Sequence, residues 1–387
     1  MIKRLSKVIK VLIKKKKTTI KDIASVLSIS AAAVSKALHN DSRISEKTKI
    51  AVRKVAENLN YQPNHLASAL RSGKSYLVGV IVPRTNSSFF SSVIKNIEEV
   101  LNKEGYNIII TQSNESYKKE CKNIDTLLFT QVDGIIASMA NETINLDYYE
   151  KVKSRGIPLI LFDRGENDLN VDYVGIDDYA SSHLIVKHLV EQGCKRIAHI
   201  GGFKHTRIFN NRIRGYKDAL KKYNLPLDEE LLTESSLTLE DGRTKMEQLL
   251  SLKNRPDAIY VAGDYAALGA QQVLLENKIK IPGEIALVGF GNEPFTAMVN
   301  PSISSINQHS DEIGKEAAVA FLSHAKKENI QQSLNKIILD AELIIRDSSN
   351  IFYHKQTQKF KLIKGQKLLK NLVKLYCNIF FKIPVEN

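Results

Sequence analysis

The larger, C-terminal part of the chain alternates short apolar runs with amphipathic stretches, and this alternation restricts the fold more than any other sequence feature. Seven runs have the length and aliphatic content of strands: Leu77–Val82, Tyr106–Ile110, Gly134–Ala137, Pro158–Phe162, Arg196–Ile200, Ala258–Val261 and Ile285–Gly289. Stretches of helical period lie between them, including Phe90–Lys103, Ser181–Gln192, Asn211–Lys222 and Tyr265–Glu276. Parallel strands covered on both faces read as apolar runs joined by helical crossovers. We therefore predict an α/β fold whose two lobes are doubly wound parallel sheets.

The segment before this region, residues 18–60, contains no Gly or Pro and is helical in period. We expect three helices whose inward residues are Ile20, Ile23, Ala24 and Leu27, then Val34, Ala37 and Leu38, then Ile50, Val52, Val55, Ala56 and Leu59. Thr18 or Thr19, Ser30 and Ser45 are placed to cap their N-termini, and Ser28-Ile29-Ser30 forms the tight turn. This pattern predicts a helix-turn-helix with a supporting helix, although three ordinary packed helices would show the same periodicity.

The outward face of the second helix distinguishes these two interpretations. It presents small or hydrogen-bond-donating side chains, namely Ser30, Ala31, Ala32, Ser35, Lys36 and His39. Small residues allow a helix to enter the major groove closely, an alanine methyl can contact a thymine methyl, and a lysine can reach guanine or a phosphate. The face therefore favours binding to double-stranded DNA.

The segments TIKDIA, VSKALHN, RISEKT and NYQPNHLASALR, in this order and spacing, resemble the DNA-binding head of the lactose/purine repressor family. The resemblance implies a hinge helix within residues 61–76 that inserts Leu70 into the minor groove at the centre of a palindromic operator. It also implies a homodimer or tetramer. The DNA-binding residues that it implies are Thr19, Ser30, Ala31, Ala32, Ser35, Lys36, His39, Arg43, Ser45, Thr48, Asn64, Ala67, Leu70 and Arg71.

Residues 77–346 resemble the effector domain of the same family, which shares its fold with periplasmic sugar-binding proteins. The blocks LVGVIVP, VDGIIAS, GIPLILFDR, RPDAIYVAGDYAALGA and NPSISSINQ carry the resemblance, among others. It implies a small polar effector, a sugar or a nucleoside-like metabolite, in the cleft between the lobes. The effector-binding residues that it implies are Phe89, Phe90, Arg164, Arg212, Asp264 and Asn292.

Two departures from the family pattern bear on this site. Gly289-Phe290-Gly291-Asn292 lacks the aspartate that follows the aromatic residue in well-known members, so we expect Asn292 to take its place with neutral hydrogen bonds. Arg84 and Ser88 stand where an aspartate and a proline are commoner. Both departures make the identity of the effector less transferable.

These features divide the chain into five parts: a basic arm (1–17), a helix-turn-helix domain (18–60), a hinge helix and linker (61–76), a two-lobed effector-binding and dimerisation domain (77–348) and a basic amphipathic tail (349–387). Lobe one is expected at about 77–165 and 295–322, and lobe two at about 166–294 and 323–348. The arm could contact phosphates or be a plain extension. The tail could pack on the body, join an oligomer contact or lie on an anionic membrane surface.

Charge and cysteine usage are consistent with this division. Residues 1–72 hold 16 Lys and Arg against 4 Asp and Glu, whereas the whole chain has a net charge of +14. A basic head suggests a polyanionic partner, or simply a solubilising end. The 3 cysteines form no CxxC pair, which fits a reducing cytoplasm. The Lys-interrupted N-terminus is a poor signal peptide, and no apolar run is long enough to span a membrane.

The sequence thus predicts a cytoplasmic, ligand-controlled transcription regulator, most simply a repressor, that binds operator DNA and a small-molecule effector. We expect no cofactor and no metal site. A solute-binding protein would lack the head, and an enzyme is disfavoured because no P-loop, GxSxG or HExxH motif occurs. A constitutive nucleoid protein would fit the charge alone and would not respond to a ligand.

Overall fold

The computed structural model describes residues 18–61, 73–326 and 334–352, which form two compact units that divide between Ser75 and Tyr76. The first unit holds three helices, α2 (Ile20–Leu27), α3 (Ala31–Leu38) and α4 (Glu46–Asn58). Their inward faces make one apolar core in which Ile23, Val34 and Val52 are completely buried. The helices and the turn between the first two are where the sequence pattern placed them.

Side-chain caps fix where these helices begin. The Ser30 hydroxyl accepts a hydrogen bond from the Ala33 amide, and the Ser45 hydroxyl accepts one from Thr48. Thr19 begins α2 with a capping box, in which its amide donates to the Asp22 carboxylate at 2.7 Å. These bonds satisfy amides that have no partner within the first turn of a helix.

One expected core residue of the first unit is misplaced. Ile50 is 61% exposed, whereas its neighbour Lys49 is buried and pairs with Glu46 at 2.7 Å. Only the first turn of α4 departs from the expectation, since Val52 and Ala56 are buried as expected. There the lysine stem covers the core while its ammonium group reaches Glu46.

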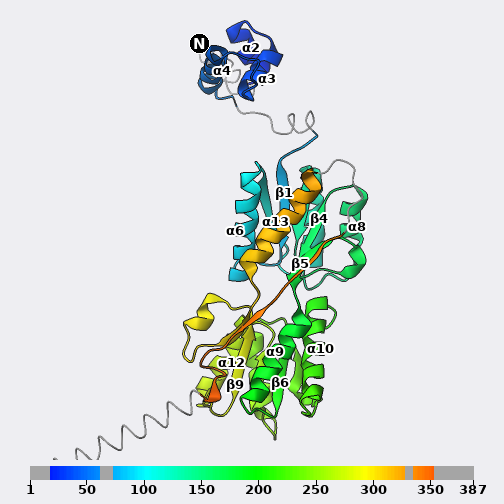
Figure 1. Ribbon diagram of the computed structural model, residues 1–387, viewed down its shortest axis with the longest axis vertical. Helices are drawn as coiled ribbons and strands as arrows, with labels where there is room; N and C mark the ends of the chain where they lie inside the picture. Colours follow the sequence, from blue (N-terminus) through cyan, green and yellow to red (C-terminus); the bar gives the residue numbers. More distant parts are fainter. Residues whose placement is uncertain (1–17, 62–72, 327–333, 353–387) are drawn as a thin grey trace, which may run out of the picture. The chain divides into compact units, whose positions relative to one another are not determined.

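The second unit consists of two lobes, each built on a six-stranded sheet (Figure 1). The first sheet has the order β11-β5-β4-β3-β1-β2, all parallel. Its strands are β1 (Leu77–Val82), β2 (Asn107–Gln112), β3 (Gly134–Ala137), β4 (Leu159–Phe162), β5 (Asp172–Ile176) and β11 (Lys336–Leu339). Its helices are α6 (Ser88–Lys103), α7 (Tyr117–Phe129), α8 (Asp147–Ser154) and α13 (Ser310–Lys326).

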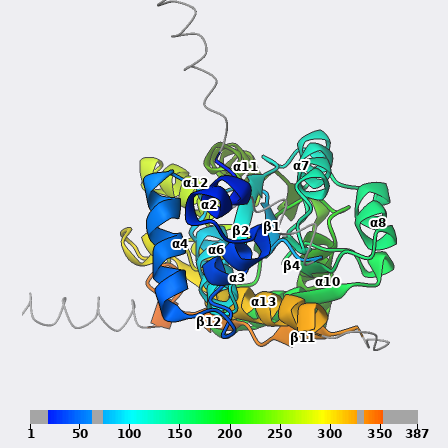
Figure 2. The same cartoon turned by 90° about the horizontal axis from the view of Figure 1, so that it is seen from above.

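The central strand of this sheet shows why apolar runs predicted it. Val78, Val80 and Val82 of β1 face the core that also includes α6 and α13, whereas Ile81 faces the core under α7 and α8. A strand with helices on both sides must be apolar at every position. The two views show α6 with α13 on one face of the sheet and α7 with α8 on the other (Figures 1 and 2).

The second lobe has the sheet order β12-β10-β9-β8-β6-β7, with β12 antiparallel. Its strands are β6 (Ile197–Gly201), β7 (Leu232–Glu234), β8 (Ala258–Val261), β9 (Ala286–Phe290), β10 (Ser304–Asn307) and β12 (Glu342–Ile344). Its helices are α9 (Asp178–Glu191), α10 (Arg207–Lys222), α11 (Leu239–Ser251) and α12 (Asp264–Glu276). Short 3-10 helices lie at Asn167–Leu169, Glu229–Leu231 and Pro294–Ala297. The two doubly wound lobes confirm the expected fold class.

The lobe boundaries expected at residues 166, 295 and 323 are wrong. β5 pairs with β4 in lobe one, and β10 pairs with β9 in lobe two. The chain therefore crosses between the lobes after β5, again between β10 and α13, and a third time between β11 and β12. Figure 1 shows the last crossing as one extended segment. The sheet that a strand joins depends on which neighbouring strand has an edge free to pair with it, and the apolar pattern of the sequence does not encode this choice.

Candidate functional site

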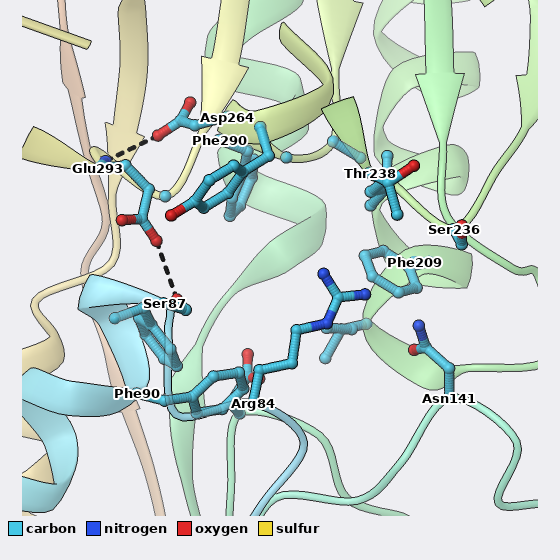
Figure 3. Close-up of a pocket in the computed structure, with 18 of the residues that line it drawn as sticks. Arg84, Ser87, Phe90, Asn141, Phe209, Ser236, Thr238, Asp264, Phe290 and Glu293 are labelled. Atoms are coloured by element: carbon cyan, nitrogen blue, oxygen red, sulfur yellow. Dashed lines mark hydrogen bonds between the residues drawn. The ribbon is translucent and has the colours of Figure 1, made fainter. Parts of the chain in front are cut away.

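A cavity of about 280 Å³ lies between the two lobes, at the carboxyl ends of their strands. Lobe one supplies residues that follow β1 and β4, and lobe two supplies residues that follow β8 and β9 and the first turns of α10. In doubly wound folds this edge is where ligands bind, because loops from several strands converge there. Figure 3 shows Arg84, Phe90, Phe209 and Asp264 around a common space.

Five of the six expected effector-binding residues line this cavity: Phe89, Phe90, Arg164, Arg212 and Asp264. Folding has brought together side chains that lie up to 175 positions apart in the chain. The five residues do not play equivalent structural roles, and the bonds that each already makes determine what it can offer a ligand.

Arg212 on α10 is the most deeply embedded of the cations, at 4% exposed. Its Nε donates to Asp178 Oδ1 at 2.8 Å and its Nη1 donates to the Ala262 carbonyl at 2.9 Å. Its guanidinium carbon lies 3.5 Å from the centre of the Phe290 ring. Burial raises the pKa of Asp178 to about 6, even though the arginine charge opposes this shift. Arg212 therefore joins α10 to α9 and to the end of β8 beside the cavity.

Arg164 and Arg84, on lobe one, share a single carboxylate. Arg164 Nη1 donates to Glu115 at 2.6 Å, and Arg84 Nε lies 3.3 Å from the other oxygen of the same group. Burial would raise the pKa of Glu115, but the Arg164 charge and hydrogen bond outweigh it and hold that pKa below its usual value. Glu115 was not expected from the sequence, because no motif marks a carboxylate that follows an irregular turn.

Two buried polar atoms in this wall make no hydrogen bond within the described part of the chain, although the first of them lies 3.9 Å from an Asp163 oxygen. They are the Arg164 Nε donor and the Asn141 Oδ1 acceptor. Both residues line the cavity. A buried donor or acceptor without a partner costs free energy, so such atoms usually mark a place where a ligand or a water supplies the missing bond.

Asp264, the first residue of α12, is 3% exposed, and both of its oxygens are engaged by the chain. The Ser305 hydroxyl donates to Oδ1 at 2.7 Å and the Glu293 amide donates to Oδ2 at 2.8 Å. Burial raises its pKa to about 6 against these hydrogen bonds. Asp264 thus shapes the loop after β9 as well as lining the cavity.

The two adjacent phenylalanines belong largely to the hydrophobic core. Phe89 and Phe90 are 8% and 5% exposed, and their rings meet edge to face at 5.1 Å. Phe90 also packs against Phe162 of β4. Phe209 was missed, although it lies one helical turn before Arg212 on the same face of α10 and its ring lines the cavity.

Asn292 does not line the cavity, in contrast to the expectation. Its Oδ1 accepts from Arg346 Nη2 at 2.7 Å, and its amide donates to Ser305. The carboxylate at this corner belongs to Glu293, one position later. Gly291 and Asn292 both have positive φ, at 132° and 52°, and this turn directs Asn292 to Arg346 while Glu293 faces the cavity.

A second, more open hollow of about 850 Å³ adjoins the first and shares residues such as Arg84, Glu115 and Asn141 with it. Amides and hydroxyls dominate its wall, which also includes Phe203 and His205. It forms a wide, polar approach beside the smaller cavity.

In the first unit, Ala32, Lys36 and His39 on α3 are exposed, and Ala31 and Ser35 are partly exposed. The structure assigns structural tasks to several of the other expected DNA-binding residues. Thr19, Ser30 and Ser45 cap helices, Thr48 bonds to Ser45, and Arg43 forms a two-point ion pair with Asp41. The His39 ring also bonds to the Ser35 carbonyl. Asn64, Ala67, Leu70 and Arg71 lie outside the described residues.

The described helices include none that combines the length and the apolar character needed to cross a membrane.

Comparisons with known proteins agree with both units. A model for bacterial regulatory proteins of the lacI family matches residues 19–64, and a periplasmic binding protein-like domain matches residues 186–349. The transcriptional regulator DegA of Bacillus subtilis is 32% identical over 86% of this chain and 98% of its own. The repressor CytR of Escherichia coli K12 is 30% identical over 86% of this chain and 96% of its own.

Solved structures show the same architecture. A transcription regulator CcpA of Lactococcus lactis, at 27% identity, matches 70% of this chain and 98% of its own with a TM-score of 0.66. The Lac repressor dimer, solved with operator and an anti-inducer, matches 86% of this chain and 99% of its own with a TM-score of 0.75 at 21% identity.

Proposed function

The chain belongs to the lacI family of bacterial regulatory proteins, and from that premise we propose that it is a repressor whose affinity for a palindromic operator is controlled by a small polar molecule bound between its lobes. That it is a DNA-binding transcriptional regulator follows from the family. The proposal that a small molecule controls operator affinity rests on one observation: a cavity with walls from both lobes occurs in a chain that also has a helix-turn-helix.

The head reads one half-site with α3. The exposed positions of this helix are a small residue, Ala32, and a lysine, Lys36, and such a surface fits the major groove closely. Ser30 and Ser45 contribute mainly by fixing the helix starts, since their hydroxyls are already used as caps. Two heads of a homodimer would read the two halves of a palindrome, and Leu70 would wedge the minor groove at its centre.

The cavity favours a neutral effector of about one ring. Its volume of about 280 Å³ is at the lower end of the range for small-molecule sites. Its three arginines face three carboxylates, those of Glu115, Asp163 and Asp178, because Arg164 also lies 3.9 Å from Asp163, so no cation is left to demand an anionic ligand. Arg164 Nε and Asn141 Oδ1 make no hydrogen bond within the described residues, so a ligand could offer one acceptor and one donor, as a pair of ring hydroxyls does. A sugar or a nucleoside-like metabolite has this chemistry.

Effector and operator are coupled through the lobes. A molecule that bonds to Arg164 on one lobe and packs on Phe209 of the other favours one spacing of the lobes, and residues 61–76 join lobe one to the head. Such coupling is reciprocal, so the effector must change operator affinity by the factor by which operator changes effector affinity. The same linkage serves an inducer or a corepressor.

A screen of neutral sugars and nucleosides for thermal stabilisation of the full chain tests this proposal. A cleft ligand raises the melting temperature by mass action. Each hit is then titrated against operator DNA, and we expect operator affinity to change. Stabilisation without any change in operator affinity would contradict the proposed control of DNA binding.

The Leu70→Ala variant tests the operator contact separately. We expect it to lose specific affinity while the dependence of affinity on salt is nearly unchanged, because an apolar wedge releases no counterions. Equal operator affinity for variant and wild type would exclude the wedge.

A further inference from the structure

One carboxylate of lobe two is bonded to the opposite lobe. Glu293, in the loop after β9, accepts hydrogen bonds from the Ser87 hydroxyl at 2.9 Å, from the Ser88 amide at 3.2 Å and from the Ser88 hydroxyl. Ser87 is the N-cap of α6 in lobe one and Ser88 is its first residue, and they lie 206 and 205 positions away from Glu293 in the chain. Figure 3 shows the bond between Glu293 and Ser87 at the rim of the cavity.

This contact is a helix cap supplied by the other lobe. Ser87 is the N-cap residue of α6, yet its side chain makes no capping bond within its own helix. The first amides of a helix lack partners, and the helix dipole favours a negative charge beside them. The Glu293 carboxylate meets both needs, and it is 6% exposed, so little water competes for it.

Two local features account for the contact jointly. Ser88 offers both an amide hydrogen and a hydroxyl, whereas a proline at this position would offer neither. On the other side, the turn at Gly291 brings Glu293 to the cavity, and the bond from the Glu293 amide to Asp264 fixes its backbone. Donors and acceptor are therefore matched across the cleft.

We propose that Glu293, with Ser87 and Ser88, is a latch that holds the two lobes together on one side of the cavity. The latch consists only of the chain's own atoms. Neighbouring contacts act in the same sense, because Tyr265 donates to the Asn86 carbonyl at 3.4 Å and the His205 ring bonds to the Asn141 carbonyl at 2.5 Å. The latch biases the lobe spacing to which the effector couples, so this inference rests on the proposed function.

Hydrogen exchange of the full-length chain, without effector or DNA, reads the latch directly. Among the described residues of wild type, Glu293 is the hydrogen-bond partner of the Ser88 amide, since helical bonds do not reach the first residue of a helix. In Glu293→Ala we expect exchange in the peptide that spans the start of α6 to be roughly 10- to 100-fold faster, as for loss of a hydrogen bond to a charged group. Glu276→Ala, which removes an exposed carboxylate of the same lobe that pairs with Arg243, is the matched control.

A second variant changes the donor side of the latch, on lobe one, and tests whether misfolding of the first variant explains the result. Ser88→Pro removes both donors of that residue, and proline is favoured at the first helical position, so α6 should be retained. Spin labels at exposed Lys118 on α7 and Glu247 on α11, in a chain whose 3 cysteines are replaced by alanine, report the distance between the lobes.

We expect each variant to broaden this distance distribution towards longer values. We expect the double variant to broaden it no further than Glu293→Ala alone, since Glu293→Ala already removes every bond of the latch whereas Ser88→Pro leaves the bond from Ser87. Unchanged exchange in Glu293→Ala, unchanged distances, or additive effects in the double variant would each overturn the latch. Because no ligand is present, a failure here is distinct from a failure of the effector screen.

Discussion

Replacing Arg212 by methionine tests whether this residue is a structural element as well as a ligand-facing one. The substitution keeps an apolar stem of similar length on Phe290 and deletes the ion pair to Asp178 and the bond to the Ala262 carbonyl. Asp178 is 4% exposed, so its carboxylate is left buried and uncompensated. Removing one partner of a buried ion pair costs about 3–5 kcal/mol. We expect a loss of unfolding free energy of that size at pH 7.

The double variant Arg212→Met with Asp178→Asn separates the charge from the packing. It leaves no uncompensated charge, and neutral replacements of a buried ion pair are often tolerated. We therefore expect it to recover most of the lost stability. Urea unfolding followed by circular dichroism measures all three proteins, because the chain has 14 tyrosines but no tryptophan for fluorescence.

The pH dependence of the single variant gives an independent check. The pKa of Asp178 is raised to about 6 in the folded wild type, and without the arginine it rises further. A raised carboxyl pKa means that stability is present at low pH and is lost as pH rises through the folded value. The deficit of Arg212→Met relative to wild type should therefore shrink as pH falls from 7 towards 4. A loss below about 1 kcal/mol at pH 7, or a double variant as unstable as the single one, would refute the reasoning.

Three further predictions concern other parts of the chain. Asp264→Asn should gain stability relative to wild type as pH rises from 4 to 7, by up to about 3 kcal/mol. The reason is that wild type loses stability over this window, because the pKa of Asp264 is about 6 in the folded protein. An equal difference in unfolding free energy between variant and wild type at all pH values would argue against it. Ser30→Ala should destabilise the first unit by about 1 kcal/mol in thermal unfolding, whereas Ser42→Ala, at an exposed position, should not. Lys36→Gln should weaken operator binding and lower the salt slope by about one unit, and unchanged affinity for operator and random duplex alike would remove Lys36 from the interface.

The sequence by itself determined those helices and strands whose positions follow from residues close together in the chain. Ser30 and Ser45 fix helix starts because their hydroxyls bond to amides three residues later. Runs such as Leu77–Val82 predict a central strand because both faces of that strand are covered. Short strands with few apolar residues, such as β10 and β12, carry no comparable signal, and they decide where the chain crosses between the lobes.

The site shows the same division at the level of single side chains. The sequence identified Arg164, Arg212 and Asp264 as cavity residues through its resemblance to the family. Only the tertiary structure decided that Arg212 is held by Asp178 and that Glu293, instead of Asn292, faces the cavity. The reason is geometric: two successive positive φ angles in one loop redirect neighbouring side chains, and a partner from another lobe is selected by position in space, which no local pattern in the chain records.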